Sequence, residues 1–198
     1  MLRNSVWQYE PDIVLLAFFA GNDLRNNLAE LESYHVRPFF QQMDGNLKLD
    51  DSFLQHPDYL KAQSLLVRCK VALTNRIRLL QFVNHVREAW RQSATAETDG
   101  EHVRAGVDLA PLAVPKDGAW KKAWEITERL ILEVAAETER HQADFYLLTI
   151  GSDVVVHRDA NVTAECCRAL GVEDLLYAQR RLTGLGAEHG FTVIDLAG

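Results

Sequence analysis

The residues best suited to chemistry follow a short apolar run near the start of the chain. Residues 13–20 are apolar without interruption, and Gly21, Asn22 and Asp23 come directly after them. The side-chain amide of asparagine can donate hydrogen bonds to an oxygen that becomes negatively charged during a reaction, and glycine lets the backbone approach a ligand closely. Asn22 is therefore a candidate catalytic residue, as an oxyanion donor, and Gly21 is a candidate substrate-binding residue.

A structural role also explains these residues. Asparagine and aspartate are preferred at helix N-termini, where their side chains accept hydrogen bonds from backbone N–H groups of the first turn. Taken alone, the tripeptide favours this capping role for Asn22 or Asp23 over a catalytic one.

A buried strand is the element that must position this loop. The run at 13–20 follows Pro11 and has no polar alternation, which predicts a strand covered on both faces, as in a parallel sheet between helices. It is too short to cross a bilayer. In such sheets ligands bind beyond the carboxyl ends of the strands, which is where Gly21, Asn22 and Asp23 fall.

The rest of the chain predicts an α/β fold. Two further apolar strands, at 145–150 and 191–196, alternate with helical segments at 120–140, 162–170 and 175–189. This alternation implies right-handed parallel crossovers.

The segments between these elements predict smaller features. They are a short helix at 24–34, a hairpin at 37–50 around Asp44-Gly45, helices from Pro57 and from about Thr74, and a flexible loop insertion at 93–118. In the helix from Thr74, the apolar residues Leu79, Val83, Val86 and Trp90 recur at helical spacing.

The string from Trp7 to Asn27, with Gly21-Asn22-Asp23 after its strand, resembles the third conserved block of the SGNH hydrolases, the GDSL-type esterases and lipases. Ala20 stands where that block, Gly-x-Asn-Asp, has its first glycine. Residues 156–175 are similar to the same bacterial branch of the family. The resemblance implies a three-layer flavodoxin-like sheet, hydrolysis of acyl esters, and Asn22 as an oxyanion-hole donor.

The family's other catalytic blocks have no counterpart at the expected places. Its nucleophilic Ser lies before the Asn block and its Asp-x-x-His block follows the last strand, whereas this sequence ends at Gly198. We therefore expect residues 1–198 to be one partial SGNH-like domain, a fragment whose Ser nucleophile and His base lie outside this chain. The alternative is a non-catalytic glycan- or acyl-binding module on the same fold.

Three local motifs imitate the missing blocks. They are Asp51-Ser52-Phe53-Leu54, Asp99-Gly100-Glu101-His102, and Gly151-Ser152-Asp153 with His157. A triad must be held rigidly within hydrogen-bond reach, and the third set is too compact for its members to point at one another. We interpret all three as structural or surface features.

The composition of the chain limits the classes of molecule that it is expected to bind. The net charge of −7 and the absence of a Lys/Arg cluster argue against nucleic acid. Three cysteines give neither a disulfide framework nor metal spacing, so no metal or cofactor is expected, and the N-terminus has no apolar core of an export signal. The expected partners are a small-molecule or glycan acyl ester and, because the resemblance implies that a missing first strand lies beside residues 12–19, a second chain at that open sheet edge.

Overall fold

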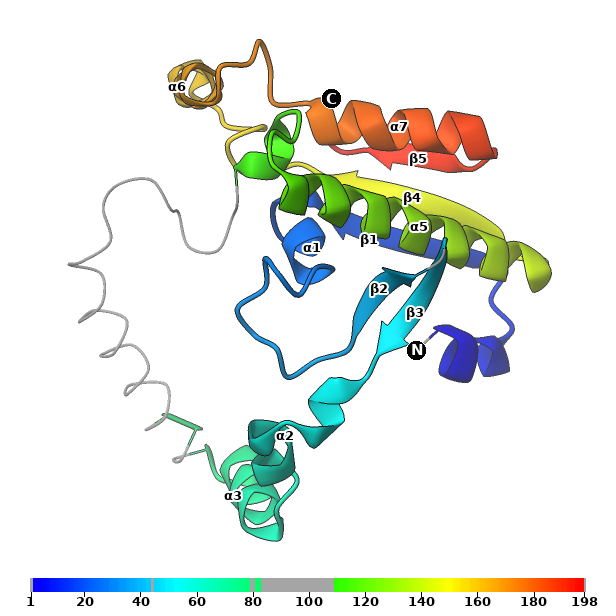
Figure 1. The fold of residues 1–198 in the computed structure, drawn as a ribbon, viewed down its shortest axis with the longest axis vertical. Helices are drawn as coiled ribbons and strands as arrows, with labels where there is room; N and C mark the ends of the chain where they lie inside the picture. The colour runs from blue at the N-terminus through cyan, green and yellow to red at the C-terminus, as the bar shows by residue number, and fades with distance from the viewer. Residues whose placement is uncertain (1, 44, 79–80, 83–108, 198) are drawn as a thin grey trace. The chain divides into compact units, whose positions relative to one another are not determined.

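The computed structural model describes residues 2–43, 45–78, 81–82 and 109–197. The chain divides into two compact units, one of residues 1–33, 39–48 and 106–198, the other of residues 34–38 and 49–105. Figure 1 gives the order of the elements along the chain. Among the described residues, no helix is long and apolar enough to span a membrane.

The first unit is built on a parallel sheet of three strands, as the sequence predicts. Its strands are β1 (Ile13–Phe19), β4 (Asp144–Ile150) and β5 (Thr192–Asp195), in the order β1-β4-β5. Leu15 lies opposite Tyr146, and Leu148 lies opposite Ile194. Within the described residues, β1 therefore has one neighbouring strand and forms an edge of this sheet.

Long helices connect the strands. Helix α5 (Gly118–Arg140) directly precedes β4 and begins where the side chain of Asp117 accepts a hydrogen bond from the N–H of Trp120 at 2.8 Å. Helix α7 (Tyr177–His189) precedes β5 and ends at Gly190, whose positive φ of 77° suits glycine. Between β4 and α7 lies α6 (Ala160–Leu170), which is capped by Asp159.

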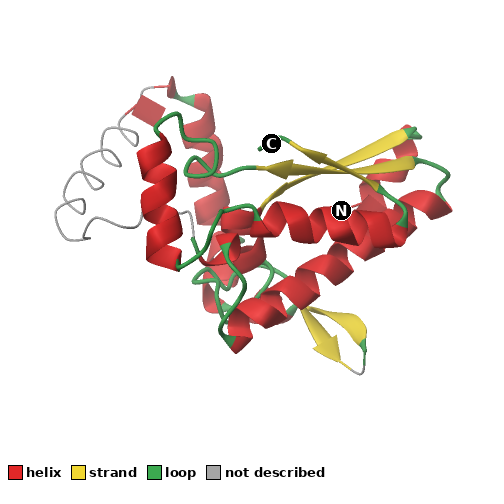
Figure 2. Ribbon diagram, turned by 90° about the horizontal axis from the view of Figure 1, so that it is seen from above, coloured by secondary structure: helices red, strands yellow, loops and turns green. Residues whose placement is uncertain are grey.

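Helices α5 and α7 lie on the same side of the sheet (Figure 2). We call the side beneath them the covered face. Its core combines strand residues with residues of α1, α5 and α7: Leu16, Phe18, Leu24, Trp124, Ile131, Phe145, Leu147, Ala178, Leu182 and Val193. Within the described part of the chain, the prediction that both faces of the first strand are covered is met on this side only.

The opposite side, which we call the open face, consists of alternate strand residues, most of them apolar: Ile13, Leu15, Ala17, Phe19, Asp144, Tyr146, Leu148, Ile150, Thr192 and Ile194. Ile13 and Leu15 expose 57% and 55% of their surface. Successive side chains of a strand point to opposite faces, so this apolar set belongs to the same strands as the buried one.

Helix α1 (Ala20–Asn26) differs from the prediction of a helix at 24–34. It begins directly after β1, so Gly21, Asn22 and Asp23 lie in its first turns rather than in a turn before it. The side chain of Asp23 explains this early start, because its Oδ2 accepts a hydrogen bond from the N–H of Phe19 at 2.7 Å. The carboxylate thereby satisfies a backbone donor that the helix leaves without an internal partner.

The predicted hairpin is present as β2 (Phe39–Met43) and β3 (Asn46–Asp50). Phe40 and Leu47 pack near α5 in a second core with Leu28, Ala123 and Ile126. Of the predicted loop insertion at 93–118, residues 93–108 lie outside the described residues. Its end is packed, with Leu112 of η4 (Ala110–Leu112) only 1% exposed.

The second unit contains η3 (Ser52–Gln55), α2 (Pro57–Ala62) and α3 (Leu65–Arg76). Pro57 occupies the first turn of α2, as the sequence predicts, and the hydroxyl of Ser64 caps α3. The apolar positions 79, 83, 86 and 90 of the predicted helix from Thr74 lie outside the described residues.

Candidate functional site

The candidate site lies at the carboxyl edge of the parallel sheet, where β1, β4 and β5 all end. Phe19 lies opposite Ile150 at this edge, and both strands lead directly into polar segments. Asn22 follows β1 by three residues and Ser152 follows β4 by two. This edge is the usual ligand-binding edge of an open parallel sheet.

Asn22 is half-buried, and its side-chain orientation is set by Arg25. The Nη2 of Arg25 donates a hydrogen bond to Oδ1 of Asn22 at 3.2 Å. A guanidinium can only donate, so the amide oxygen must face it and the NH2 group must face away. Among the residues that the structure describes, the Nδ2 of Asn22 meets no hydrogen-bond acceptor. The arrangement therefore leaves two donor hydrogens available at the end of β1.

The neighbouring side chain has a different task. Asp23 binds the N–H of Phe19, so the capping role that the sequence allowed for either residue is filled by Asp23. Asn22 accepts no backbone hydrogen bond in the first turn of α1. Capping therefore accounts for the side chain of Asp23. It does not account for the orientation of the Asn22 side chain.

Gly21 is buried in the first turn of α1. Its φ is not positive, so glycine is not required there by backbone conformation. Its role in substrate binding stays a prediction.

The ends of β4 and β5 are joined by side-chain hydrogen bonds. Thr149 donates its hydroxyl to Oδ1 of Asp195 at 2.8 Å, and the same oxygen accepts the N–H of Ala197 at 3.0 Å. These contacts lie on the covered face, because Thr149 and Asp195 alternate with the open-face residues. They hold the two strand ends together next to the site.

Ser152 and His157 do not form a catalytic pair. Ser152 is 3% exposed and its hydroxyl has no hydrogen-bond partner among the described residues. The Nδ1 of His157 instead accepts the N–H of Asp159 at 3.1 Å, within its own loop. This geometry agrees with the interpretation of Gly151-Ser152-Asp153 as a structural loop.

The other two motifs that resemble catalytic blocks, at 51–54 and 99–102, do not form a catalytic site among the described residues. Ser52 begins η3 in the second unit, where its backbone N–H donates to Asp50 at 3.0 Å. Asp99 and His102 lie outside the described residues. Among the described residues, no group of three or more His, Cys, Asp or Glu side chains could hold a metal ion, and Cys69, Cys166 and Cys167 are free thiols.

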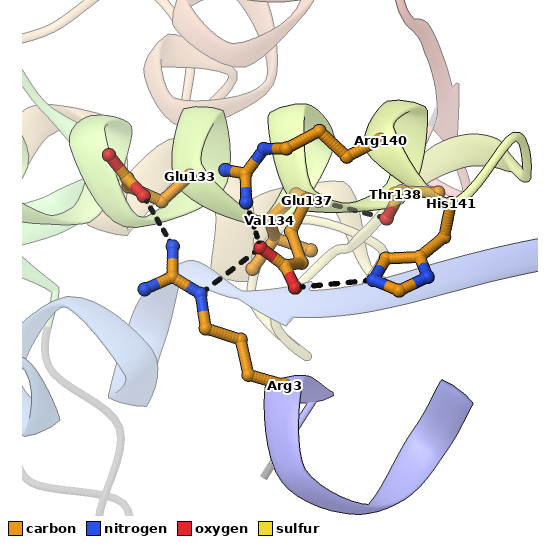
Figure 3. Close-up of polar contacts among 7 residues, drawn as sticks. All are labelled: Arg3, Glu133, Val134, Glu137, Thr138, Arg140 and His141. Atoms are coloured by element: carbon orange, nitrogen blue, oxygen red, sulfur yellow. Dashed lines mark hydrogen bonds and ion pairs between the residues drawn. The ribbon is translucent and has the colours of Figure 1, made fainter. Parts of the chain in front are cut away.

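A polar cluster far from this edge attaches the N-terminal segment to α5 (Figure 3). Arg3 contacts Glu133 at 2.9 Å and Glu137 at 3.1 Å, and Arg140 also pairs with Glu137. The carboxylate of Glu137 is buried, whereas Arg3 is 60% exposed. Burial raises the pKa of Glu137, but the hydrogen bond from Arg3 and the charges of Arg140 and Arg3 outweigh burial, so its pKa lies below the ordinary 4.5.

An aromatic contact adds to this attachment. The rings of Trp7 and His141 stack with their centroids 3.9 Å apart and their planes 7° from parallel. Because Trp7 and Arg3 both precede β1, these contacts fix the entry of the chain into the sheet. We assign the cluster a structural role.

A second polar cluster lies between α5 and α7. Arg181 binds both carboxylate oxygens of Glu128, at 2.5 and 2.9 Å, and its guanidinium lies over the ring of Trp124 at 4.7 Å. The hydrogen bond from Glu128 raises the pKa of Arg181 despite partial burial. The sequence did not predict this pair or the Arg3 contacts, because no local pattern relates residues so far apart.

No known protein-family model, curated protein or solved structure matches this chain.

Proposed function

We propose that this chain is part of an SGNH-type hydrolase that acts on acyl esters. Asn22 is the oxyanion-hole donor. The observation that supports this role is the orientation of its amide, with the oxygen held by Arg25 and the NH2 group unoccupied at the carboxyl end of β1. A donor fixed before the reaction stabilises the developing negative charge without a reorganisation cost.

The sheet order supports the proposed flavodoxin-like fold. The order β1-β4-β5 leaves the far side of β1 without a neighbour among the described strands. In the proposed fold, the strand that bears the nucleophile lies at that side. The attacking Ser would then lie at the same carboxyl edge as Asn22, because parallel strands end at one edge.

The chemistry assigned to this chain is limited to one part of the reaction. A Ser outside the chain attacks the ester carbonyl and a His outside the chain accepts the Ser proton. The carbonyl oxygen becomes an oxyanion, to which Asn22 donates. Arg25 is a positioning residue, because it acts on the substrate only through Asn22. The substrate is a small-molecule or glycan acyl ester.

The chain by itself should not hydrolyse p-nitrophenyl acetate above background, because oxyanion stabilisation without a nucleophile gives little acceleration. The control is the same assay on Ser52→Ala and Ser152→Ala. Turnover that either substitution abolishes would contradict the assignment of the nucleophile to a position outside this chain.

The test of Asn22 starts from the reading frame extended into its flanking sequence, which on this proposal supplies the Ser and the His. Asn22→Ala should lower kcat by about 10²- to 10³-fold, the usual cost of one oxyanion donor. Asn22→Asp keeps an acceptor for Arg25 but opposes the oxyanion, so it should lower kcat at least as far. Asn26→Ala, in the last turn of α1, is the matched control and should keep its activity.

Circular dichroism separates a catalytic from a structural role. Asn22 makes one hydrogen bond, so Asn22→Ala should remain folded. An unfolded variant would mean that Asn22 mainly stabilises α1. An extended frame that encodes neither Ser nor His in the required places would favour the glycan- or acyl-binding module.

We also propose that this chain, when separated from the strand that bears the nucleophile, self-associates through the free edge of β1. The proposal needs no catalytic activity and can be tested on this chain directly.

A further inference from the structure

A cavity of about 690 Å³ lies at the amino ends of β4 and β5, between the C-terminal ends of α5 and α7. Helix α5 directly precedes β4 and α7 directly precedes β5, so both helices end at this edge of the sheet (Figure 1). Ala135, Ala136 and Ala143 line the cavity, and side chains of this size leave space between the two helices. The volume is within the range of about 300–1,000 Å³ that is typical of small-molecule sites.

This cavity is separate from the candidate site at Asn22. Asn22 follows the carboxyl end of β1, whereas the cavity lies at the opposite edge of the sheet. Strand β4 spans seven residues, so the two edges are roughly 20 Å apart. Among the described residues that line the cavity, none belongs to β1, so its walls do not depend on what lies beside the free edge of that strand.

Two aromatic residues form a corner of the cavity. Phe145 of β4 and Phe191, which directly precedes β5, have their ring centroids 5.2 Å apart and their planes at 69°. Both residues line the cavity and pack against the core of the covered face, which holds the two rings in place. The face of an aromatic ring carries partial negative charge and attracts cations, and pairs of rings are a common means of binding quaternary ammonium groups.

The rim of the cavity is acidic. Glu139 and Asp144 line it, both are exposed, and neither carboxylate has a hydrogen-bond or ion-pair partner among the described residues. No lysine or arginine is among the described lining residues, and Arg140, next to Glu139 in the sequence, is bound to Glu137. The C-terminal ends of α5 and α7 contribute the negative ends of their helix dipoles. The charges around the cavity therefore favour a cation and disfavour an anion.

We propose that this cavity binds a small organic cation, an ammonium group attached to an apolar body. The ammonium group lies in the corner formed by Phe145 and Phe191, and Glu139 and Asp144 balance its charge from the rim. A metal ion does not fit as well, because no group of three or more His, Cys, Asp or Glu side chains among the described residues could hold one. The proposal does not rest on the hydrolase function, since it concerns binding at the other edge of the sheet.

The test is a titration of the isotope-labelled chain, at about 50 µM, with choline chloride followed by NMR. A pH of about 8 is chosen because histidine is ordinarily uncharged there, and His189 also lines the cavity. Choline should bind with a Kd on the order of 1 mM, because each contribution is weak, and should shift the amide signals of residues 142–144 and 189–192. The alcohol in which a tert-butyl group replaces the trimethylammonium group has the same shape without the charge. It should bind about tenfold more weakly or less.

Substitutions test the rim and the corner separately. Glu139→Gln should weaken choline binding roughly threefold, the usual effect of one exposed charge, and should leave the fold intact. Glu125→Gln is the matched control, because Glu125 is exposed on the same helix and does not line the cavity, so it should keep the Kd of the unaltered chain. Phe191→Leu keeps an apolar side chain against the core but removes the ring, and should weaken binding about three- to tenfold. If circular dichroism shows Phe191→Leu unfolded, Asp144→Asn combined with Glu139→Gln replaces it.

Three results would overturn the proposal. Equal binding of choline and the uncharged alcohol would mean that the cavity selects apolar groups and not cations. The same shifts with sodium chloride, or equal weakening by Glu125→Gln, would mean that cations are attracted only by the net charge of −7. Absence of any shift up to about 20 mM choline would mean that the cavity does not bind organic ammonium groups. None of these results bears on the role of Asn22, because the measurement needs no catalytic activity.

Discussion

The two faces of the central sheet have similar side chains but different surroundings. On the covered face, Phe18 and Leu147 are 5% and 0% exposed beneath α5 and α7. On the open face, Leu15 and Ile194 from the same strands are 55% and 40% exposed. Composition is therefore not what distinguishes a core from a surface in this sheet.

The comparison shows what an uninterrupted apolar strand does and does not specify. Such a strand gains free energy from cover on either face, by about 25 cal/mol for each Å² of apolar surface removed from water. It contains no information on which element supplies the cover. The covered face is specified by the amphipathic pattern of α5, whereas the described part of the chain has no equivalent pattern packed on the open face.

Among substitutions that test the difference between the two faces, we expect the largest loss of unfolding free energy at Leu147. Leu147→Ala should cost about 2–5 kcal/mol of unfolding free energy, because it removes a fully buried side chain and leaves a cavity. Leu15→Ala should cost less than about 1 kcal/mol at low concentration, since most of its surface already meets water. Urea unfolding of both variants at about 1 µM measures the difference. Equal costs would mean that the open face is covered in solution even in the monomer.

The next effect tests how closely α7 packs on the covered face. A Cβ at Gly186 would lie 2.5 Å from Cγ2 of Val193 and 2.8 Å from the carbonyl oxygen of Phe191, so Gly186→Ala must displace β5 from the helix. We expect a loss of about 1–3 kcal/mol, the usual cost of overpacking.

Gly184 provides the matched control within the same helix. A Cβ there meets nothing within 4 Å, and alanine forms helices better than glycine, so Gly184→Ala should stabilise the protein by about 0.5–1 kcal/mol. Thermal melts of the two variants should therefore shift in opposite directions. A shift of both in the same direction would contradict the tight contact between α7 and β5.

Local sequence patterns predicted most of the sheet unit. The three strands are apolar runs bounded by Pro11, Gly151 and Gly190, and α5 has a strong helical repeat, so each is specified within its own segment. The predicted start of this helix, at residue 24, was wrong because the prediction assigned Gly-Asn-Asp to a turn, whereas α1 begins at Ala20. The signal that could have corrected it is local: an aspartate four residues after Phe19 can bind that residue's N–H.

The surroundings of the candidate site were only partly predictable. The contact between Asn22 and Arg25 spans three residues, so it follows once both are placed on one helix. The pairing of Thr149 with Asp195 depends on the register of two strands that are distant in sequence. The exposure of the open face depends on the complete arrangement of the chain, which no local pattern contains.

The smallest effect concerns the segment that leads into the exposed edge strand. The pKa of Glu137 is lower in the folded protein than its ordinary 4.5, so the folded state binds this proton less readily than the unfolded state does. The resulting stabilisation is fully present above pH 4.5 and is lost as the pH falls through the lowered pKa. The effect should be small because Arg3 is 60% exposed and the contact holds one short segment.

Amide exchange of residues 2–9, followed from pH 7 downwards and corrected for the intrinsic pH dependence of exchange, measures this attachment. Glu137→Gln removes the charge that binds Arg3 and Arg140, so the segment should exchange faster than in the unaltered chain already at neutral pH and show a weaker pH dependence. Glu139→Gln, an exposed position of the same helix, is the control and should keep the pH dependence of the unaltered chain. A segment that stays equally protected in Glu137→Gln would mean that the stacking of Trp7 on His141 is sufficient to hold it, and that the ion pairs contribute little.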